Sequence, residues 1–224
     1  WWDPLTGKIA RAGGAQLDLD LAPYESRVLV FSKQAVLDPP LPMGLETTAM
    51  DLSTGWKVTF PGAPPIEMQK LVSWADEPDR KYYSGQATYE KTVTLDAALA
   101  GRTLILNFGQ GTAVTADTRR SGSGMRAMID SPVREAAVVW VNEKRAGSVW
   151  CAPYEVNVTG LLHAGANSIR VVVANLALNR MAGSPLPDYK ALNAKYGERF
   201  QAQDMNAAQP QPSGLLDGVR LVTR

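Results

Sequence analysis

The chain has little of the chemistry that marks several functional classes. Its 224 residues include one cysteine, Cys151, and one histidine, His163. An internal disulfide, a cysteine-rich metal site and a two-histidine ligand set are therefore excluded. The 23 basic residues nearly balance the 22 acidic ones, and neither sign forms a long block. The charge pattern thus predicts neither a nucleic-acid partner nor an anionic membrane as partner.

Long apolar runs are also missing. No run reaches the roughly 18 to 20 residues that a helix needs to cross a bilayer, and no basic-then-apolar signal segment opens the sequence. The chain begins with WWDPLTGKI and has no initiator methionine. We interpret it as a piece of a longer protein, so any targeting signal is expected elsewhere.

Short strand-like segments separated by glycine, proline and asparagine are abundant instead. Alternating apolar residues and β-branched residues predict strands in these segments. A helical pattern occurs at residues 188–197, where Gly197 closes the helix. The many short strands, with only this one helix, predict an all-β fold, an antiparallel β-sandwich of jelly-roll topology. The predicted strands are 56–60, 86–95, 103–108, 136–141, 147–149, 154–158, 168–173 and 218–222.

The first forty residues are organised differently. Strands are predicted at 1–9, 16–21 and 27–32, and the segment DPPLP at 38–42 reads as a linker because its prolines cannot join a ladder. Three short strands are marginally stable alone. We therefore interpret residues 1–40 as the terminal strands of a preceding β-domain and residues 45–224 as the jelly-roll.

A β-hairpin is predicted within VVWVNEKRAGSVWCAPYEVNVTGLL at 138–162. Residues 142–145 form its polar turn, where Asn142 tolerates left-handed backbone conformations. Thr159 is expected to accept a backbone hydrogen bond at the end of the segment. The valines expected in the sandwich core are Val139, Val141, Val149, Val156 and Val158.

Three segments resemble the sugar-binding domain of family 2 glycoside hydrolases in their order and spacing. They are YSGQATYEKTVTL at 83–95, TLILNFG at 103–109 and AAVVWVNEKRAGSVWCAPYEVNVTGLLHAGANSIRVVVAN at 136–175. The resemblance implies a galactose-binding-domain-like jelly-roll. Glu143 stands where these domains usually have glycine, which predicts a different turn type.

Other segments resemble the C-terminal region of family 106 α-L-rhamnosidases: LALNRMAG at 176–183, PSGLLDGVRLV at 212–222, WWDPLTGKI and LAPYESRVLVF. This resemblance implies a module that binds carbohydrate or supports the catalytic domain of the same parent chain. It also implies a periplasmic or secreted location, with the catalytic carboxylates elsewhere in that chain.

Sugar binding requires flat aromatic faces for stacking and planar polar groups for paired hydrogen bonds. The segment SWADEPDRKYY at 73–83 interleaves both kinds in one loop. For each aromatic residue, packing in the core or against a missing domain is the alternative. The candidates are Trp74, Tyr82, Tyr83 and Trp150 for stacking, and Asp76, Asp79, Arg80, Asn175, Asn179 and Arg180 for hydrogen bonds.

A further candidate, Asp204, comes from a second resemblance. QDM at 203–205 and SGLL at 213–216 resemble a segment of family 2 β-galactosidases that reaches the active site, although AAQPQP lengthens the gap and Asn206 replaces a tryptophan. The resemblance implies that Asp204 binds sugar or a cation; the alternative is a solvated loop carboxylate. No cofactor is predicted, and structural calcium is left open because no D-x-D-x-D-G loop occurs.

Two other functions compete with carbohydrate recognition. One is a purely structural module that packs on a catalytic barrel without contacting sugar. The other is a small autonomous glycosidase, because two suitably spaced carboxylates suffice for glycoside hydrolysis. The carboxylates available in predicted loops are Asp76, Glu77, Asp79 and Asp204.

Overall fold

The computed structural model describes residues 46–114, 129–198, 208–216 and 218–224, together with residues 2, 9, 19, 26, 28–31 and 33. Most of the segment predicted to be a preceding β-domain lies outside these residues. Trp2 forms isolated antiparallel bridges with Ile9 and Val28, and the domain itself stays a prediction. In the described part of the chain, no helix is long and apolar enough to cross a membrane.

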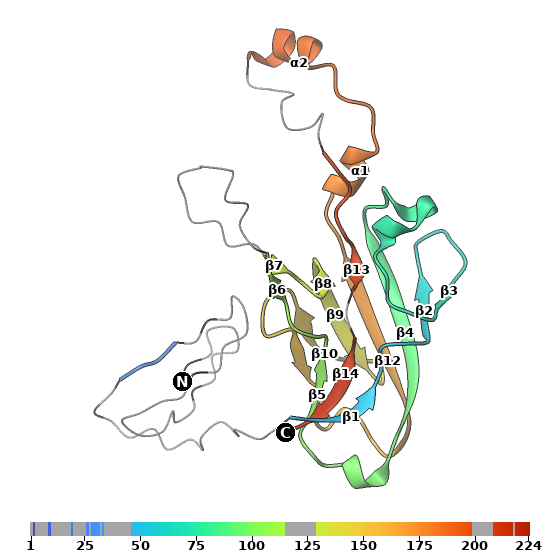
Figure 1. The fold of residues 1–224 in the computed structure, drawn as a ribbon, viewed down its shortest axis with the longest axis vertical. Helices are drawn as coiled ribbons and strands as arrows, with labels where there is room; N and C mark the ends of the chain where they lie inside the picture. Colours follow the sequence, from blue (N-terminus) through green and yellow to red (C-terminus); the bar gives the residue numbers. More distant parts are fainter. Residues whose placement is uncertain are drawn as a thin grey trace.

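Two antiparallel sheets form the sandwich (Figure 1). The larger sheet has the strand order β10 (Lys144–Val149), β9 (Ala136–Val141), β12 (Gly165–Ala174), β4 (Gln86–Leu95), β2 (Trp56–Thr59) and β3 (Ile66–Met68). The smaller has the order β1 (Thr47–Asp51), β14 (Arg220–Thr223), β5 (Leu104–Asn107) and β11 (Glu155–Asn157). The predicted all-β antiparallel sandwich is confirmed.

Short elements extend the two sheets at their ends. β13 (Gly214–Leu215) pairs with β8 (Val133–Arg134), and β6 (Thr112–Ala113) pairs with β7 (Ile129–Asp130). Three 3₁₀ turns are η1 (Trp74–Asp76), η2 (Pro78–Arg80) and η3 (Ala97–Leu99), and two helices are α1 (Leu178–Ala182) and α2 (Tyr189–Tyr196). The helix predicted at 188–197 is thus observed, with Asp188 at its N-cap and Gly197, at φ 83°, at its C-cap.

The core lies between the two sheets because each central strand alternates between buried and more exposed side chains. In β12, Ile169, Val171 and Val173 are buried, whereas Ser168 is exposed and Arg170 is partly exposed. The smaller sheet contributes buried Leu106 and Leu221 from the other side. Burying one such side chain contributes about 1.5 to 3 kcal/mol. All five valines expected in the core are buried.

Each predicted strand between residues 56 and 222 overlaps an observed one, with ends shifted by up to three residues. The two-residue strands β6, β7, β8 and β13 were not predicted. Two longer strands also had no sequence signal: β1, with the sequence TTAMD, and β3, with the sequence IEM. Both are edge strands, where one neighbour suffices and apolar alternation is not needed. Helix α1 was also missed.

The hairpin turn corrects two predictions. Lys144 pairs with Val141 and Arg145 with Trp140, so the turn has two residues instead of the four predicted. Asn142 has φ 48° and Glu143 has φ 63°. Positive φ at both central residues is the geometry of a type I′ turn, which normally favours glycine at the second position. The different turn type predicted from Glu143 is therefore not observed. The turn is of type I′, and glutamate at its second position strains the backbone.

The Asn142 side chain fastens this turn to the loop that precedes β12. Its Nδ2 donates to the Leu161 carbonyl at 2.9 Å and to Asn167 Oδ1 at 2.8 Å, and its Oδ1 accepts from the Ser168 amide at 2.9 Å. Thr159 Oγ1 accepts from the Leu104 amide at 3.0 Å, as expected. The side chains of Asn142 and Thr159 thus have structural partners.

Replacing Glu143 by glycine should stabilise the protein, because glycine adopts positive φ without a steric penalty. We expect the free energy of unfolding to rise by about 1 kcal/mol, measured by chemical denaturation. The matched control is Lys144→Gly in the adjoining strand, which should lower it by about 0.5 to 1 kcal/mol. A Glu143→Gly protein no more stable than the parent chain would contradict the assigned strain.

Candidate functional site at the loop rim

One end of the sandwich carries most of the predicted sugar-binding residues. We call this end the rim; it comprises residues 73–84, 175–184 and 209–216. The rim follows from the two longest strands, because β4 begins at Gln86 where β12 ends at Ala174, and these two residues pair. The chain before β4 and the chain after β12 therefore emerge side by side.

Two asparagines join the rim segments. Asn175 Oδ1 accepts from the Gly85 amide at 2.8 Å, and its Nδ2 donates to the Tyr83 carbonyl at 2.8 Å and to Ser213 Oγ at 3.0 Å. Asn179 Nδ2 donates to the Gln211 carbonyl at 2.7 Å and also to Ser213 Oγ, at 3.0 Å. Asn179 Oδ1 accepts from the Gln211 amide at 3.2 Å.

Ser213 is the hub of this network. Its carbonyl accepts from the Trp74 amide at 3.0 Å, and its amide donates to Ser73 Oγ at 3.1 Å. Ser213 and Asn179 are both buried, with 1% of their surface exposed. Neither serine was predicted as a site residue; SGLL at 213–216 was the one sequence signal that pointed to Ser213. The two asparagines and two serines hold the rim together.

An aromatic cluster lies beneath the rim. The Trp74 ring meets those of Phe60 and Tyr83 edge to face, with centroids 5.3 and 5.7 Å away. Trp74 Nε1 donates to the Tyr89 hydroxyl at 2.6 Å. The Arg80 guanidinium lies 4.9 Å from the Phe60 ring centroid. Edge-to-face pairs contribute about 0.5 to 1.5 kcal/mol each beyond area burial.

Burial changes the interpretation of several predicted residues. Trp74 is 0% exposed, so neither face of its ring is open to a sugar. The Asn179 amide is used within the rim, and the Tyr83 hydroxyl donates to the Gln86 carbonyl at 2.7 Å. Burial also raises the pKa of Tyr83. In this structure these three side chains hold the rim together. For Trp74 and Tyr83, packing inside the protein, the alternative to sugar stacking, is therefore what the structure shows.

The remaining predicted residues divide by exposure. Tyr82 is 45% exposed, and its ring lies against Gly183, where an added Cβ would come within 2.3 Å of Tyr82 Cγ. Asp76, Asp79 and Arg180 are exposed, and Arg80 is partly exposed. Asp204 lies outside the described residues. Sugar contacts by any of these residues stay predictions.

Trp150 stands apart from the rim aromatics. It is 60% exposed and follows Val149, which pairs with Ala137 at the same end of the large sheet. Its strand, β10, lies three strands from β4, which is about 14 Å at ordinary strand spacing. Trp150 at the edge strand and Tyr82 before the interior strand β4 are therefore well separated at this end.

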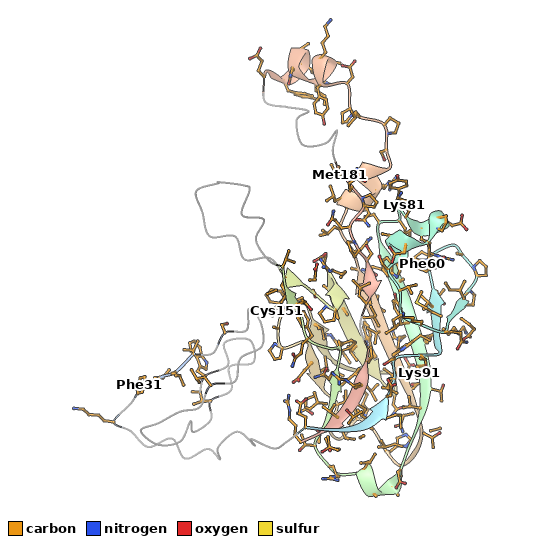
Figure 2. The ribbon with its side chains drawn as sticks, viewed as in Figure 1. Phe31, Phe60, Lys81, Lys91, Cys151 and Met181 are labelled. Atoms are coloured by element: carbon orange, nitrogen blue, oxygen red, sulfur yellow. The ribbon has the colours of Figure 1, made fainter. Side chains whose placement is uncertain are left out.

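Exposed apolar side chains accompany the rim. Figure 2 labels Met181 and Lys81 at this end, with Phe60 below them. Met181 is 50% exposed, and Leu176 and Leu186, from the segment around α1, are 42% and 50% exposed. Among the described residues, no three His, Cys, Asp or Glu side chains gather as metal ligands would. The rim thus presents large apolar side chains among exposed charged ones, and calcium binding stays untested.

Comparisons with known proteins agree with this architecture. A putative β-glucuronidase from Formosa agariphila is 28% identical over 138 residues, which are 59% of this chain and 10% of that protein. A rhamnosidase from Novosphingobium sp. PP1Y matches with 25% identity and a TM-score of 0.57 over 88% of this chain and 16% of its own. The chain is similar to glycoside hydrolase domains.

Two other findings limit what this similarity shows. A Ruminococcus gnavus β-glucuronidase has a TM-score of 0.50 and 20% identity over 80% of this chain and 29% of its own, which shows a shared fold alone. No protein-family profile matches the chain. The chain spans a small part of each relative, and its specific assignment to family 106 stays a prediction.

Substitution of Asn179 tests the buried network. Asn179→Ala removes the partners of the Gln211 amide and carbonyl, so the free energy of unfolding should fall by about 2 to 3 kcal/mol. Arg180→Ala, at the exposed neighbouring position, should change it by less than about 0.5 kcal/mol. Chemical denaturation of both variants measures the difference. Equal losses would show that Asn179 does not hold the rim.

Tyr89 makes stability depend on alkaline pH. Burial raises its pKa from 10.0 to about 12. Above pH 10 the unfolded chain releases this proton while the folded chain retains it. Stability present below pH 10 is therefore lost as the pH rises to 12, by about 2 to 3 kcal/mol.

The Tyr89→Phe variant should lack this component. Denaturation curves at several pH values should fall less steeply for the variant than for the parent chain between about pH 10 and 12. At neutral pH the variant should be about 1 to 3 kcal/mol less stable, because Trp74 Nε1 loses its acceptor. Parallel pH profiles would rule out a buried, proton-retaining Tyr89.

Proposed function

We propose that this chain is a supporting β-sandwich module of a larger glycoside hydrolase of the α-L-rhamnosidase type, and that its rim docks on the catalytic domain of the same parent chain. The rhamnosidase similarity over 88% of the chain supports the first part. The chain accounts for 16% of that rhamnosidase, which leaves ample length for a catalytic domain.

The observation that carries the proposal is that some rim side chains are buried and bonded internally while others are exposed. Polar and aromatic side chains expected to bind sugar, such as Trp74 and Asn179, are used in internal packing and hydrogen bonds. The exposed side chains include the apolar Tyr82, Leu176 and Met181. A rigid frame with an exposed apolar surface fits a protein interface, because large apolar side chains stabilise a contact only when water is excluded.

Helix α2 supports the same conclusion. It stands away from the sandwich (Figure 1), and none of its eight residues is buried. Its cap is well formed, since Asp188 Oδ1 accepts from the Ala191 amide at 3.0 Å. Isolated helices of this length are marginal in water. A helix with caps but no core of its own is stabilised when it packs on a partner, which is the role we assign to the catalytic domain.

Docking is tested with the parent chain produced as two pieces, the present chain and the remainder. Calorimetry should show binding, and Met181→Asp should raise the dissociation constant at least tenfold, or about 1.4 kcal/mol, because it places a charge in an apolar contact. The matched control is Ala98→Asp in η3, at the opposite end of the sandwich. Equal affinities for all three proteins would remove the rim from the interface.

Carbohydrate recognition at the same end is the second candidate function. It is favoured by Trp150, whose ring is 60% exposed, and by Tyr82 at 45%, since flat exposed rings suit the C–H faces of a pyranose. The three strand spacings between them suit separate contacts better than one monosaccharide subsite. Autonomous catalysis by the loop carboxylates stays a prediction with no supporting geometry.

A further inference from the structure

A row of polar side chains crosses the outer face of the large sheet, away from the rim. Its members belong to six different strands and are direct cross-strand partners. Alternation along each strand places them on the face opposite the core. In strand order they are Arg145, Trp140, Arg170, Glu90, Lys57 and Glu67.

A depression of about 350 Å³ lies along this row. This volume is at the lower end of the roughly 300 to 1,000 Å³ that small-molecule pockets occupy. Lys57, Glu67 and Glu90 line it on one side, and Arg170 and Glu143 line it on the other. Residues from four strands and the hairpin turn thus converge on one place.

Three charged side chains of this depression, Lys57, Glu67 and Glu90, are not paired with one another. Although Lys57 lies opposite both Glu67 and Glu90, no ion pair or side-chain hydrogen bond forms among these three within the described residues. Lys91 differs, since its ammonium donates to the carbonyls of Thr54 and Gly55. Opposite charges that face one another without forming an ion pair can accept hydrogen bonds from a bound molecule and donate hydrogen bonds to it.

Arg170 is held in place. Its guanidinium lies 4.2 Å from the Trp140 ring centroid, and its Nη2 is 3.6 Å from Glu143 Oε2. Stacking fixes the plane of the guanidinium, so its donors keep one direction. A fixed planar donor loses little entropy when a ligand binds.

Glu143 adds an independent observation. It occupies a left-handed position, φ 63°, at which glycine would be unstrained. Strain of this kind is stored at functional sites more often than elsewhere. Here the strained residue places a carboxylate at the edge of the depression.

We propose that this depression binds a neutral saccharide unit through hydrogen bonds alone, since none of the described residues that line it carries an aromatic ring for stacking. Carboxylates accept from sugar hydroxyls, and the Arg170 and Lys57 side chains donate to them. Three carboxylates and three cations, Lys91 included, line the depression, so its charges balance and an acidic sugar gains no net electrostatic attraction there. A metal ion is disfavoured too, because these carboxylates are not gathered as metal ligands would be. The site is separate from the rim and does not depend on docking there.

Titration of the 224-residue chain with methyl α-L-rhamnopyranoside and methyl β-D-galactopyranoside tests the site, followed by amide shifts in NMR spectra. At least one should give saturable shifts at Thr92, Ser168 and Ile169, with a dissociation constant on the order of 1 mM. Sodium glucuronate should bind more weakly. No saturable shift with either glycoside would overturn the proposal, as would tighter binding of glucuronate.

Two variants separate binding from folding. Glu143→Gly removes a carboxylate while relieving strain, so it should weaken binding about tenfold in a chain that is more stable. Lys144→Ala, its neighbour outside the depression, should leave affinity unchanged. Unchanged affinity in Glu143→Gly counts against the site. Shifts confined to Tyr82 and Trp150 overturn it as well, and locate binding at the rim end.

Discussion

The pairing of β4 with β12 is the constraint on which the rest of the structure depends. Ten consecutive residue pairs join these strands, from Gly165 with Leu95 to Ala174 with Gln86. The pairing sets which side chains of both strands face the core, because a slip of one residue would turn every side chain to the other face. It also brings the chain before β4 next to the chain after β12, where the rim forms.

Both candidate surfaces follow from this register. At the strand ends, Gly85 and Asn175 are adjacent, so that Asn175 can join the loop before β4 to the segment around Ser213. In the strand interior, Glu90 lies opposite Arg170, which completes the polar row across the outer face. The register of one strand pair therefore positions the rim at one end of the sandwich and the polar row on one side.

The two surfaces have different chemistry for a physical reason. The rim has long segments that can fold back on themselves, and they satisfy their own polar groups with Asn179, Ser73 and Ser213. What remains outside includes exposed Leu176 and Met181 beside charged side chains, a mixture that suits a protein partner. The outer face consists of regular strands, whose backbone groups are already paired. Among its cross-strand neighbours, Lys57, Glu67 and Glu90 form no ion pair with one another, and we propose that they bind a small polar ligand.

The sequence by itself determined the strand-rich fold, the faces of the long strands, the hairpin and the end of helix α2 at Gly197. These features depend on local periodicity and on the backbone freedom of single residues. Only the tertiary structure decided that Trp74 is enclosed while Tyr82 is exposed, although both lie in one aromatic loop.

Contacts between distant residues explain this difference. Ser73 is fixed by Ser213, 140 residues away, and the polar row needs five separate strand pairings. No local pattern encodes such contacts, because the energy of a loop side chain is set by the neighbours that the whole fold brings to it.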